Sequence, residues 1–354
     1  MRVYFSDRHV THSPKTFLVR GQMTQCPEVP ERADILLSAA TQDGHEICAI
    51  ENFGLDPVMR IHDQGHVEFL ESAWEEWSKL PNPAPEVVPN VHPGRNMNGT
   101  PQTILGKAGR YQADAACPIG VGTWEAVRTS ADTALTAAST VMTDFDSGEK
   151  TPFAYALSRP PGHHAFADQA GGFCYLNNSA MAAQHCLDRG AKKVAIIDVD
   201  VHHGNGTQGI FYHRSDVLTI SLHGDPAAFY PFYLGFADER GVDAGQGFNC
   251  NHPLPYGTGD EPYLAELMKA IEELKAYKPD VVVVALGLDA SEYDGLHAFL
   301  KVTTFGFEQI GRELGKVELP VVLIQEGGYI SDHLGANLSA VLRGFEATRS
   351  QQSR

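Results

Sequence analysis

The sequence predicts an α/β protein with an open, mostly parallel β-sheet and helices on both faces of that sheet. Short, continuous runs of Val, Ile and Leu recur along the 354 residues, and strands buried on both faces of a parallel sheet have this composition. Helical patterns separate most of these runs. Alternation of strands and helices over such a length is typical of a parallel sheet covered by helices on both sides.

The predicted elements follow one another along the chain. Strands are expected at Arg2–Ser6, Phe153–Leu157, Val194–Asp200, Val217–Leu222, Val281–Gly287 and Val321–Glu326. Helices are expected at Thr123–Met142, Asn177–Gly190, Glu261–Tyr277, Phe305–Gly315 and Leu334–Glu346. Gly190 suits the end of its helix, because glycine readily takes the positive φ of a helix C-terminus.

The segment Leu80–Ile119 breaks this pattern. It carries seven prolines, with Asn and Gly residues between them. A structureless loop of this length is unusual inside a compact domain and is often functional. We expect a lid, a dimerisation arm or a surface excursion here, and favour a functional role.

The composition is that of a soluble globular protein, with 43% hydrophobic and 20% charged residues. The N-terminus turns polar too early for a signal peptide, and no apolar run approaches the roughly 20 residues of a membrane span. Six cysteines are scattered without a Cys-x-x-Cys pair. These features predict reduced thiols in a cytoplasmic enzyme with no membrane partner, and argue against a disulfide framework or a cysteine zinc site.

The formal net charge of −17 argues against a nucleic-acid partner, because binding to phosphates needs a basic surface. Two interpretations of the acidity stay open. The charge either keeps the protein soluble or attracts a cationic substrate. Charge alone does not choose between them.

The most informative segment is Asp198-Val-Asp-Val-His-His-Gly-Asn-Gly206, which follows a predicted strand. Burying a carboxylate without a positive partner is costly. Side chains at every second position of a strand share one face, so Asp198, Asp200 and His202 are predicted to line up on one side. A metal ion is the simplest partner for that row.

Three further polar clusters follow predicted strands: Arg159–Ala165, Gly287–Ala290 and Gln325–Tyr329. Each has an ordinary interpretation by itself, namely a surface His-His pair, a helix N-cap Asp and a Gly-Gly-Tyr turn with a packed ring. Open α/β sheets bind ligands at the carboxyl ends of their strands. Four clusters at this edge together predict one site.

A catalytic metal is predicted from three side chains, Asp200, His202 and Asp289. Three protein ligands leave a position open for water, whereas structural zinc sites are usually closed by four. Water at such an ion ionises near neutral pH. Asp198 and Asn205 are candidates for orienting an imidazole through a hydrogen bond.

Proton transfer and carbonyl polarisation are assigned to three other residues. His163 and His164 supply a general base and acid. Tyr329, next to a Gly-Gly turn, can donate a hydrogen bond to a carbonyl oxygen and its oxyanion. Together with a metal and water, these groups predict hydrolysis of an amide or ester. A Gly-x-Ser-x-Gly elbow and a P-loop are both missing from the sequence.

These motifs resemble those of the histone deacetylase superfamily, and most closely those of its bacterial acetylpolyamine amidohydrolases, the histone deacetylase-like amidohydrolases. The segments that carry the resemblance are Arg159–Ala165, Gly171–Asn178, Asp198–Thr207, Ser221–His223 and Glu326–Tyr329. Gly122–Ala126, Ser221–Pro226 and the Met1-Arg-Val opening favour the acetylpolyamine branch. The likeness runs from near the N-terminus to about Gly344.

The resemblance implies the arginase–deacetylase fold, with a sheet of about eight strands in a single deacetylase domain spanning residues 1–354. The Pro-rich segment, residues 80–119, resembles the insertion that builds a homodimer and narrows the substrate tunnel.

The resemblance also implies roles for individual residues. Asp200, His202 and Asp289 match zinc ligands, His164 the usual general base and acid, and His163 its electrostatic partner. Asp198 pairs with His163, Asn205 stands beside His164, and Tyr329 matches the carbonyl-polarising tyrosine. Gly172, Phe173 and Tyr230 match the substrate tunnel, where many members have Phe at the last position; core packing is the alternative for the two aromatic residues. A structural K⁺ or Na⁺ would use Asp198, Asp200, His202, Ser221 and Leu222.

One departure concerns specificity. Polyamine-selective relatives often carry an acidic residue at the tunnel rim, but the matching positions here hold Leu105, Ala116 and Leu296. Glu86, Asp114, Asp294 or a partner subunit would have to serve instead.

The first hypothesis is therefore a zinc-dependent deacetylase of N-acetylated polyamines, such as acetylputrescine, acetylcadaverine and acetylspermidine, or of similar small cationic amines. The alternative is a deacetylase of acetyl-lysine in proteins with the same mechanism. A catalytically inactive acyl-binding relative has no support, because every expected catalytic position is filled. An arginase-like enzyme with two Mn²⁺ ions is disfavoured, because Gly204 follows His203 where a further Asp ligand would lie. The Asp/His/Asp set would also accept Fe(II), Co(II) or Mn(II).

Overall fold

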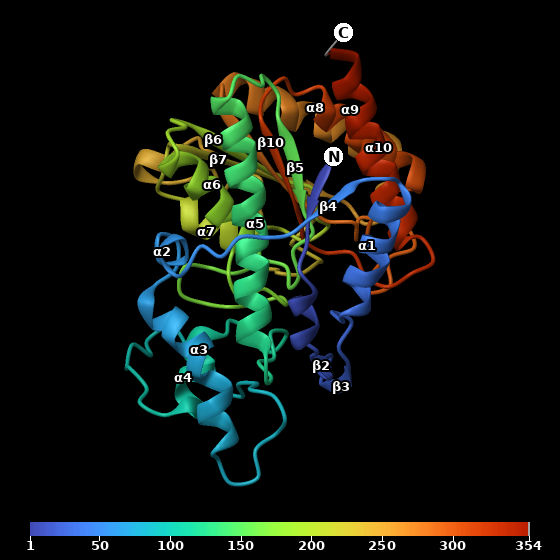
Figure 1. Cartoon of the computed structure of the whole chain (residues 1–354). Coiled ribbons are helices and arrows are strands. Elements are labelled where there is room, and N and C mark those ends of the chain that lie inside the picture. Colours follow the sequence, from blue (N-terminus) through green and yellow to red (C-terminus); the bar gives the residue numbers. More distant parts are fainter. Residues whose placement is uncertain (353–354) are drawn as a thin grey trace.

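The computed structural model describes residues 1–352, and its centre is an eight-stranded sheet in the order β4-β1-β5-β10-β9-β6-β7-β8 (Figure 1). Every neighbouring pair runs parallel. The strands are β1 (Arg2–Tyr4), β4 (Glu46–Cys48), β5 (Phe153–Ala156), β6 (Val194–Asp198), β7 (Val217–Gly224), β8 (Asn249–Leu254), β9 (Val281–Leu286) and β10 (Val321–Gln325). The predicted α/β class and parallel sheet are confirmed.

Helices cover both faces of the sheet. They are α1 (Glu31–Gln42), α2 (Asp56–Met59), α3 (Gln64–Ser78), α4 (Ile104–Tyr111), α5 (Thr123–Asp146), α6 (Asn178–Asp188), α7 (Asn205–Phe211), α8 (Asp260–Tyr277), α9 (Thr304–Gly315) and α10 (Leu334–Gln352). Alternate residues of each central strand face opposite layers. In β6, Ala195 and Ile197 belong to the core cluster that includes residues of α1, α8, α9 and α10, whereas Val194 and Ile196 belong to the cluster that includes residues of α3, α5 and α6.

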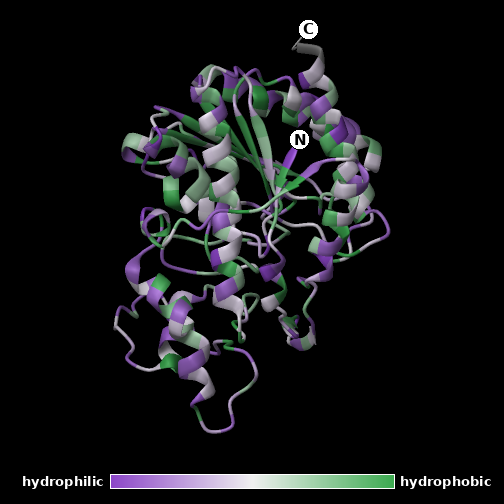
Figure 2. Ribbon diagram, viewed as in Figure 1, coloured by the Kyte–Doolittle hydropathy of each residue, from purple (hydrophilic) through white to green (hydrophobic). Residues whose placement is uncertain are grey.

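The hydropathy of the chain follows this arrangement, with hydrophobic residues concentrated in the sheet and on the inner sides of the helices (Figure 2). All six cysteines are free, and five of them are buried. Within residues 1–352, no helix is long and apolar enough to cross a membrane.

The edge strands and several helices were not predicted. β4 has only three residues, and β8 reads Asn-Cys-Asn-His-Pro-Leu, which lacks the Val/Ile run of a central strand. The expectation of a structureless segment at Leu80–Ile119 was wrong, because α4 lies inside it. Ile104 and Ala108 are buried on one side of α4, and the helix packs on α3.

A small hairpin stands apart from the main sheet. β2 (Thr16–Val19) and β3 (Gln22–Gln25) pair antiparallel, and the two residues between them, Arg20 and Gly21, have φ of 51° and 76°. Two positive φ values are characteristic of the tight turns that join such strands. The hairpin places its residues at the open end of the site described next.

Candidate active site

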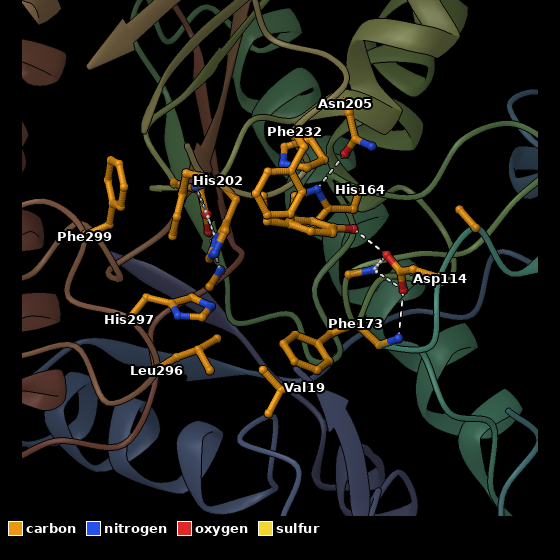
Figure 3. Close-up of a pocket in the computed structure, with 18 of the residues that line it drawn as sticks. Val19, Asp114, His164, Phe173, His202, Asn205, Phe232, Leu296, His297 and Phe299 are labelled. Atoms are coloured by element: carbon orange, nitrogen blue, oxygen red, sulfur yellow. Dashed lines mark hydrogen bonds and ion pairs between the residues drawn. The ribbon is translucent and has the colours of Figure 1, made fainter. Parts of the chain in front are cut away.

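Four loops meet at the carboxyl edge of the sheet because the strands that precede them are neighbours. β5, β10, β9 and β6 lie side by side, and the chain segments that leave them carry the tandem histidines, Tyr329, Asp289 and Asp200. They border a cavity of about 860 Å³, part of which is drawn in Figure 3. Sheet topology therefore brings all four polar clusters to one place.

Asp200, His202 and Asp289 form a tight, buried group. One ligand atom from each lies within 4.8 Å of the others. His202 Nδ1 lies 3.1 Å from Asp200 Oδ1 and 3.2 Å from Asp289 Oδ2. β6 ends at Asp198, so Asp200 and His202 belong to the following loop, and the prediction that they share one strand face with Asp198 was wrong.

The electrostatics of this group fit a metal ion. Burial lowers the pKa of His202, but Asp200 and Asp289 outweigh it and raise that pKa to about 9. Burial and the neighbouring Asp200 raise the pKa of Asp289. Two carboxylates forced together out of water need a positive charge between them, and two oxygens with one imidazole nitrogen are a donor set that Zn²⁺ accepts. The residues present therefore fit a zinc ion.

The tandem histidines have different partners and different charges. His163 Nδ1 donates to Asp198 Oδ2 at 2.8 Å, and His164 Nδ1 donates to Asn205 Oδ1 at 2.6 Å. Burial lowers the pKa of His163, but Asp198 and Asp200 more than offset it, so that pKa lies well above its ordinary value. Burial and the adjacent charge of His163 hold the pKa of His164 well below its ordinary value. The His163 ring is thus charged and the His164 ring neutral.

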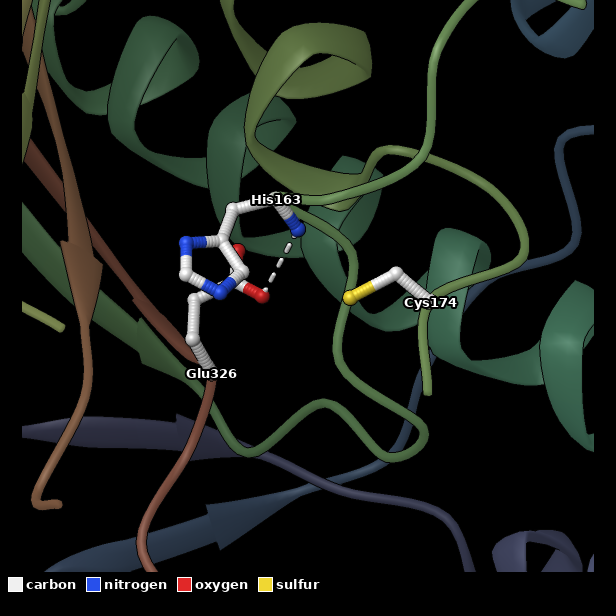
Figure 4. A group of neighbouring side chains, drawn as sticks. All are labelled: His163, Cys174 and Glu326. Atoms are coloured by element: carbon white, nitrogen blue, oxygen red, sulfur yellow. Dashed lines mark hydrogen bonds between the residues drawn. The ribbon is translucent and has the colours of Figure 1, made fainter. Parts of the chain in front are cut away.

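Glu326 holds the histidine loop in place, a role that was not predicted from the sequence. Its Oε2 accepts from the backbone N–H of Gly162 at 2.6 Å and of His163 at 3.1 Å, and its Oε1 accepts from Ser179 Oγ at 2.8 Å. Burial raises the pKa of Glu326 to about 7, against the pull of His163. Glu326 also lies beside Cys174 and His163 (Figure 4), but its oxygens already serve three donors, which favours a clamp over a second metal site. The sequence signal that could have indicated this role is the position of the Glu326 carboxylate directly after the buried strand β10.

The wall of the cavity includes the predicted tunnel residues Gly172, Phe173 and Tyr230. Gly172 has φ of 51°, and a Cβ there would collide with the His164 ring. The Tyr230 ring meets the His164 ring edge-on, with centroids 5.0 Å apart. Tyr329 is buried, lines the cavity and contacts the Phe173 ring edge-on.

A buried ionic network, which was not predicted from the sequence, holds these loops in position. Arg159 and Arg32 both donate to Glu28 Oε1 at 2.7 Å. Arg32 also donates to the Glu326 carbonyl at 2.9 Å, and its guanidinium lies 4.8 Å from the centre of the Tyr329 ring. The network ties the N-terminal segment to the loop after β10, so the position of Tyr329 depends on residues far away in sequence.

The residues predicted for a monovalent cation lie behind the catalytic loops. Asp198 and Ser221 are register partners on β6 and β7. Ser221 Oγ lies 2.9 Å from His223 Nδ1, and Leu222 is fully buried. A cation at Asp198, Asp200, His202, Ser221 and Leu222 stays a prediction.

A parallel α/β sheet with an Asp/His/Asp group and paired histidines at its strand ends defines a hydrolase of the deacetylase type. The family model for the histone deacetylase domain matches residues 26–345. Acetylpolyamine amidohydrolase 2 of Pseudomonas aeruginosa is 42% identical over 98% of this chain and 99% of its own, and acetylpolyamine amidohydrolase of Burkholderia pseudomallei is 43% identical over 99% and 100%. The crystal structure of acetylpolyamine aminohydrolase from Burkholderia pseudomallei superimposes with a TM-score of 0.92 at 42% identity, covering 98% of this chain and 99% of that one.

The chain belongs to the histone deacetylase family, and it is a hydrolase with the arginase–deacetylase fold.

Proposed function

We propose that this protein is a zinc-dependent amidohydrolase that removes the acetyl group from N-acetylated polyamines or similar small cationic amines. The observation that carries the proposal is that Asp200 and His202, which form a group with Asp289, line the same cavity as the tandem histidines and Tyr329. The names of the full-length relatives support the substrate class.

A Zn²⁺ ion held by Asp200, His202 and Asp289 would supply a Lewis acid for the acetyl carbonyl and lower the pKa of a water molecule. His164 is neutral, and its Nδ1 proton is engaged by Asn205. Its Nε2 is therefore the atom that accepts the proton of the attacking water and passes it to the leaving nitrogen.

Other side chains stabilise the charge that develops on the acetyl group. The Tyr329 hydroxyl donates a hydrogen bond to the carbonyl oxygen as that oxygen becomes negative. His163 is held by its hydrogen bond to Asp198, and its ring centre lies 4.0 Å from that of His164. The positive charge of His163 also stabilises the negative charge that develops on the carbonyl oxygen. The water oxygen bonds to the carbonyl carbon, the C–N bond breaks, and acetate and a free amine leave.

The test is a substrate profile with purified, zinc-loaded protein, comparing N-acetylputrescine, N-acetylcadaverine and N-acetylspermidine with an acetyl-lysine peptide. We expect the highest kcat/KM on a small acetylated amine. Tyr329→Phe, which removes only the hydroxyl, should lower kcat by about 10²–10³. A higher kcat/KM on the peptide would favour the protein deacetylase instead, and unchanged turnover by Tyr329→Phe would disprove the role of that residue.

We also propose a homodimer through residues 80–119 and a cytoplasmic location. Three large apolar side chains of that segment, Val91, Met97 and Leu105, are each more than half exposed, which supports a partner surface there. The free cysteines support a reducing compartment.

A further inference from the structure

Only one of the three acidic residues that the sequence offered for recognition of a cationic substrate lines the cavity. Glu86 is buried, and its carboxylate accepts from the backbone N–H of Lys15 at 2.6 Å and from Thr16 Oγ1 at 2.7 Å. Asp294 accepts from the backbone N–H groups of Leu296 and Tyr329 at 2.8 and 3.0 Å and serves as a brace for that loop. Both carboxylates are committed to the architecture around the site.

Asp114 has a different setting. Among the cavity-lining residues of the described chain, carboxylates belong only to Asp114 and to the metal-ligand candidate Asp200. Asp114 is partly exposed, and it stands beside Phe173 on the side of the cavity opposite His297 (Figure 3). It is therefore a negative charge on an otherwise largely apolar wall.

The Asp114 carboxylate is held by uncharged donors. Its Oδ1 accepts from the Ala116 N–H at 2.8 Å, its Oδ2 accepts from the Tyr230 hydroxyl at 2.6 Å, and the Gly172 N–H approaches both oxygens at 3.2 to 3.3 Å. Such donors fix the direction of a carboxylate without cancelling its charge, and they leave lone pairs for a further donor. The Tyr230 hydroxyl donates to Asp114, and the ring of the same tyrosine contacts the His164 ring edge-on. Tyr230 therefore connects Asp114 to the catalytic end of the cavity.

The hairpin turn contributes a positive charge to the cavity wall. Arg20 is the lining residue with a permanent cation in the described chain. An ammonium group is attracted to Asp114 and repelled by the Arg20 guanidinium.

We infer that Asp114, oriented by Tyr230, is the specificity residue that binds the distal ammonium group of the substrate. The inference rests on the proposed function and narrows it to N-acetylated short-chain diamines, in which a few methylene groups separate the acetamide from the ammonium. The apolar wall contacts the methylene chain, and the Asp114 carboxylate accepts the ammonium hydrogen bond.

The test compares two substrates of the same length and shape, N-acetylputrescine and the uncharged N-pentylacetamide. Asp114→Asn keeps the size and the acceptor oxygen of the side chain and removes its charge. We expect kcat/KM for N-acetylputrescine to fall about tenfold or more, mainly through KM, because a charge-assisted hydrogen bond is lost. For N-pentylacetamide we expect a change of less than about twofold. Asp238→Asn, at an exposed carboxylate outside the cavity lining, removes the same charge and should leave both values near wild type.

A second readout does not depend on turnover. Calorimetric titration of putrescine, the diamine product, should give a weaker affinity for Asp114→Asn than for wild type and for Asp238→Asn. Equal loss for both substrates, or equal putrescine affinity in all three proteins, would overturn the inference and leave Asp114 a structural brace for the Gly172 wall. If wild type bound putrescine through Asp114 but hydrolysed neither amide, the proposed function would fail and the ammonium site would stand.

Discussion

The floor and the rim of the cavity are built from different kinds of structure. The floor is made by Asp200, His202, His163 and His164, which follow central strands, and Asp289 lies in one group with the first two. Each of these residues is at most 5% exposed. The rim is made by Arg20 in the hairpin turn and by Tyr233 and Tyr256 in the loops that follow β7 and β8, and the two tyrosines are 89% and 70% exposed. The floor is fixed by sheet topology and buried hydrogen bonds, whereas the rim depends on segments that the sheet does not constrain.

This difference assigns catalysis to the floor of the cavity and substrate selectivity to its rim. At the floor, each charged group has a partner of opposite charge or a fixed hydrogen bond, so its protonation state is set before a substrate binds. At the rim, single charges stand in partly solvated positions, where interactions are weaker and are screened by salt. Substitutions at the floor should therefore change kcat by orders of magnitude, and substitutions at the rim should change the choice of substrate by smaller factors.

The largest effect is expected at His164. Replacing it with Ala removes the neutral ring that carries the proton, and kcat should fall by about 10²–10⁴. Asn205→Ala keeps the ring but removes the acceptor at Nδ1, and by analogy with other groups that orient an imidazole it should cost about 10–100-fold. Steady-state kinetics with metal analysis checks both. A His164→Ala protein that retained zinc and kept kcat within a few-fold of wild type would show that the proton travels by another route.

A smaller effect is expected for metal binding as a function of pH. In the metal-free protein the pKa of His202 is about 9, raised by Asp200 and Asp289 against the effect of burial, so at neutral pH a zinc ion must displace its proton. Because one proton is displaced, zinc affinity should increase about tenfold for each unit by which the pH rises, up to about pH 9.

The same shift has a consequence for stability. A histidine pKa raised by folding stabilises the metal-free protein most fully below its unfolded value of 6.5, and this contribution is lost as the pH rises through 9. Stabilisation by zinc should therefore increase between pH 6.5 and 9. Chelator competition and Tm with and without zinc, at several pH values, measure the two effects. Zinc affinity that did not change with pH would contradict the protonated state of His202.

The contrast between floor and rim also explains how far the sequence could predict this molecule. The central strands are continuous apolar runs, so their positions and the polar residues that follow them were predictable. The parallel order brings Asp200 and Asp289 together although they lie far apart in the sequence. Glu326, Arg32 and Glu28 were missed because their roles come from contacts between distant segments, which leave no local pattern. The cavity wall above the floor was least predictable, because the hairpin has a mixed composition and the role of Asp114 depends on its hydrogen bonds with Tyr230 and Gly172.

The smallest effect, and the one that most sharpens the comparison, is expected at Arg20. Arg20 is exposed and lines the cavity. Arg20→Gln removes a repulsive charge, so kcat/KM for N-acetylputrescine should rise by about two- to threefold at low ionic strength, and the gain should vanish near 1 M salt, where the screening length is only about 3 Å. N-pentylacetamide should respond at neither salt concentration. Asp114→Asn should lower the same kcat/KM. The two substitutions together therefore test whether Asp114 attracts the ammonium group and Arg20 repels it. A loss of activity on the cationic substrate in Arg20→Gln would mean that Arg20 contacts the substrate itself, and that the ammonium lies elsewhere.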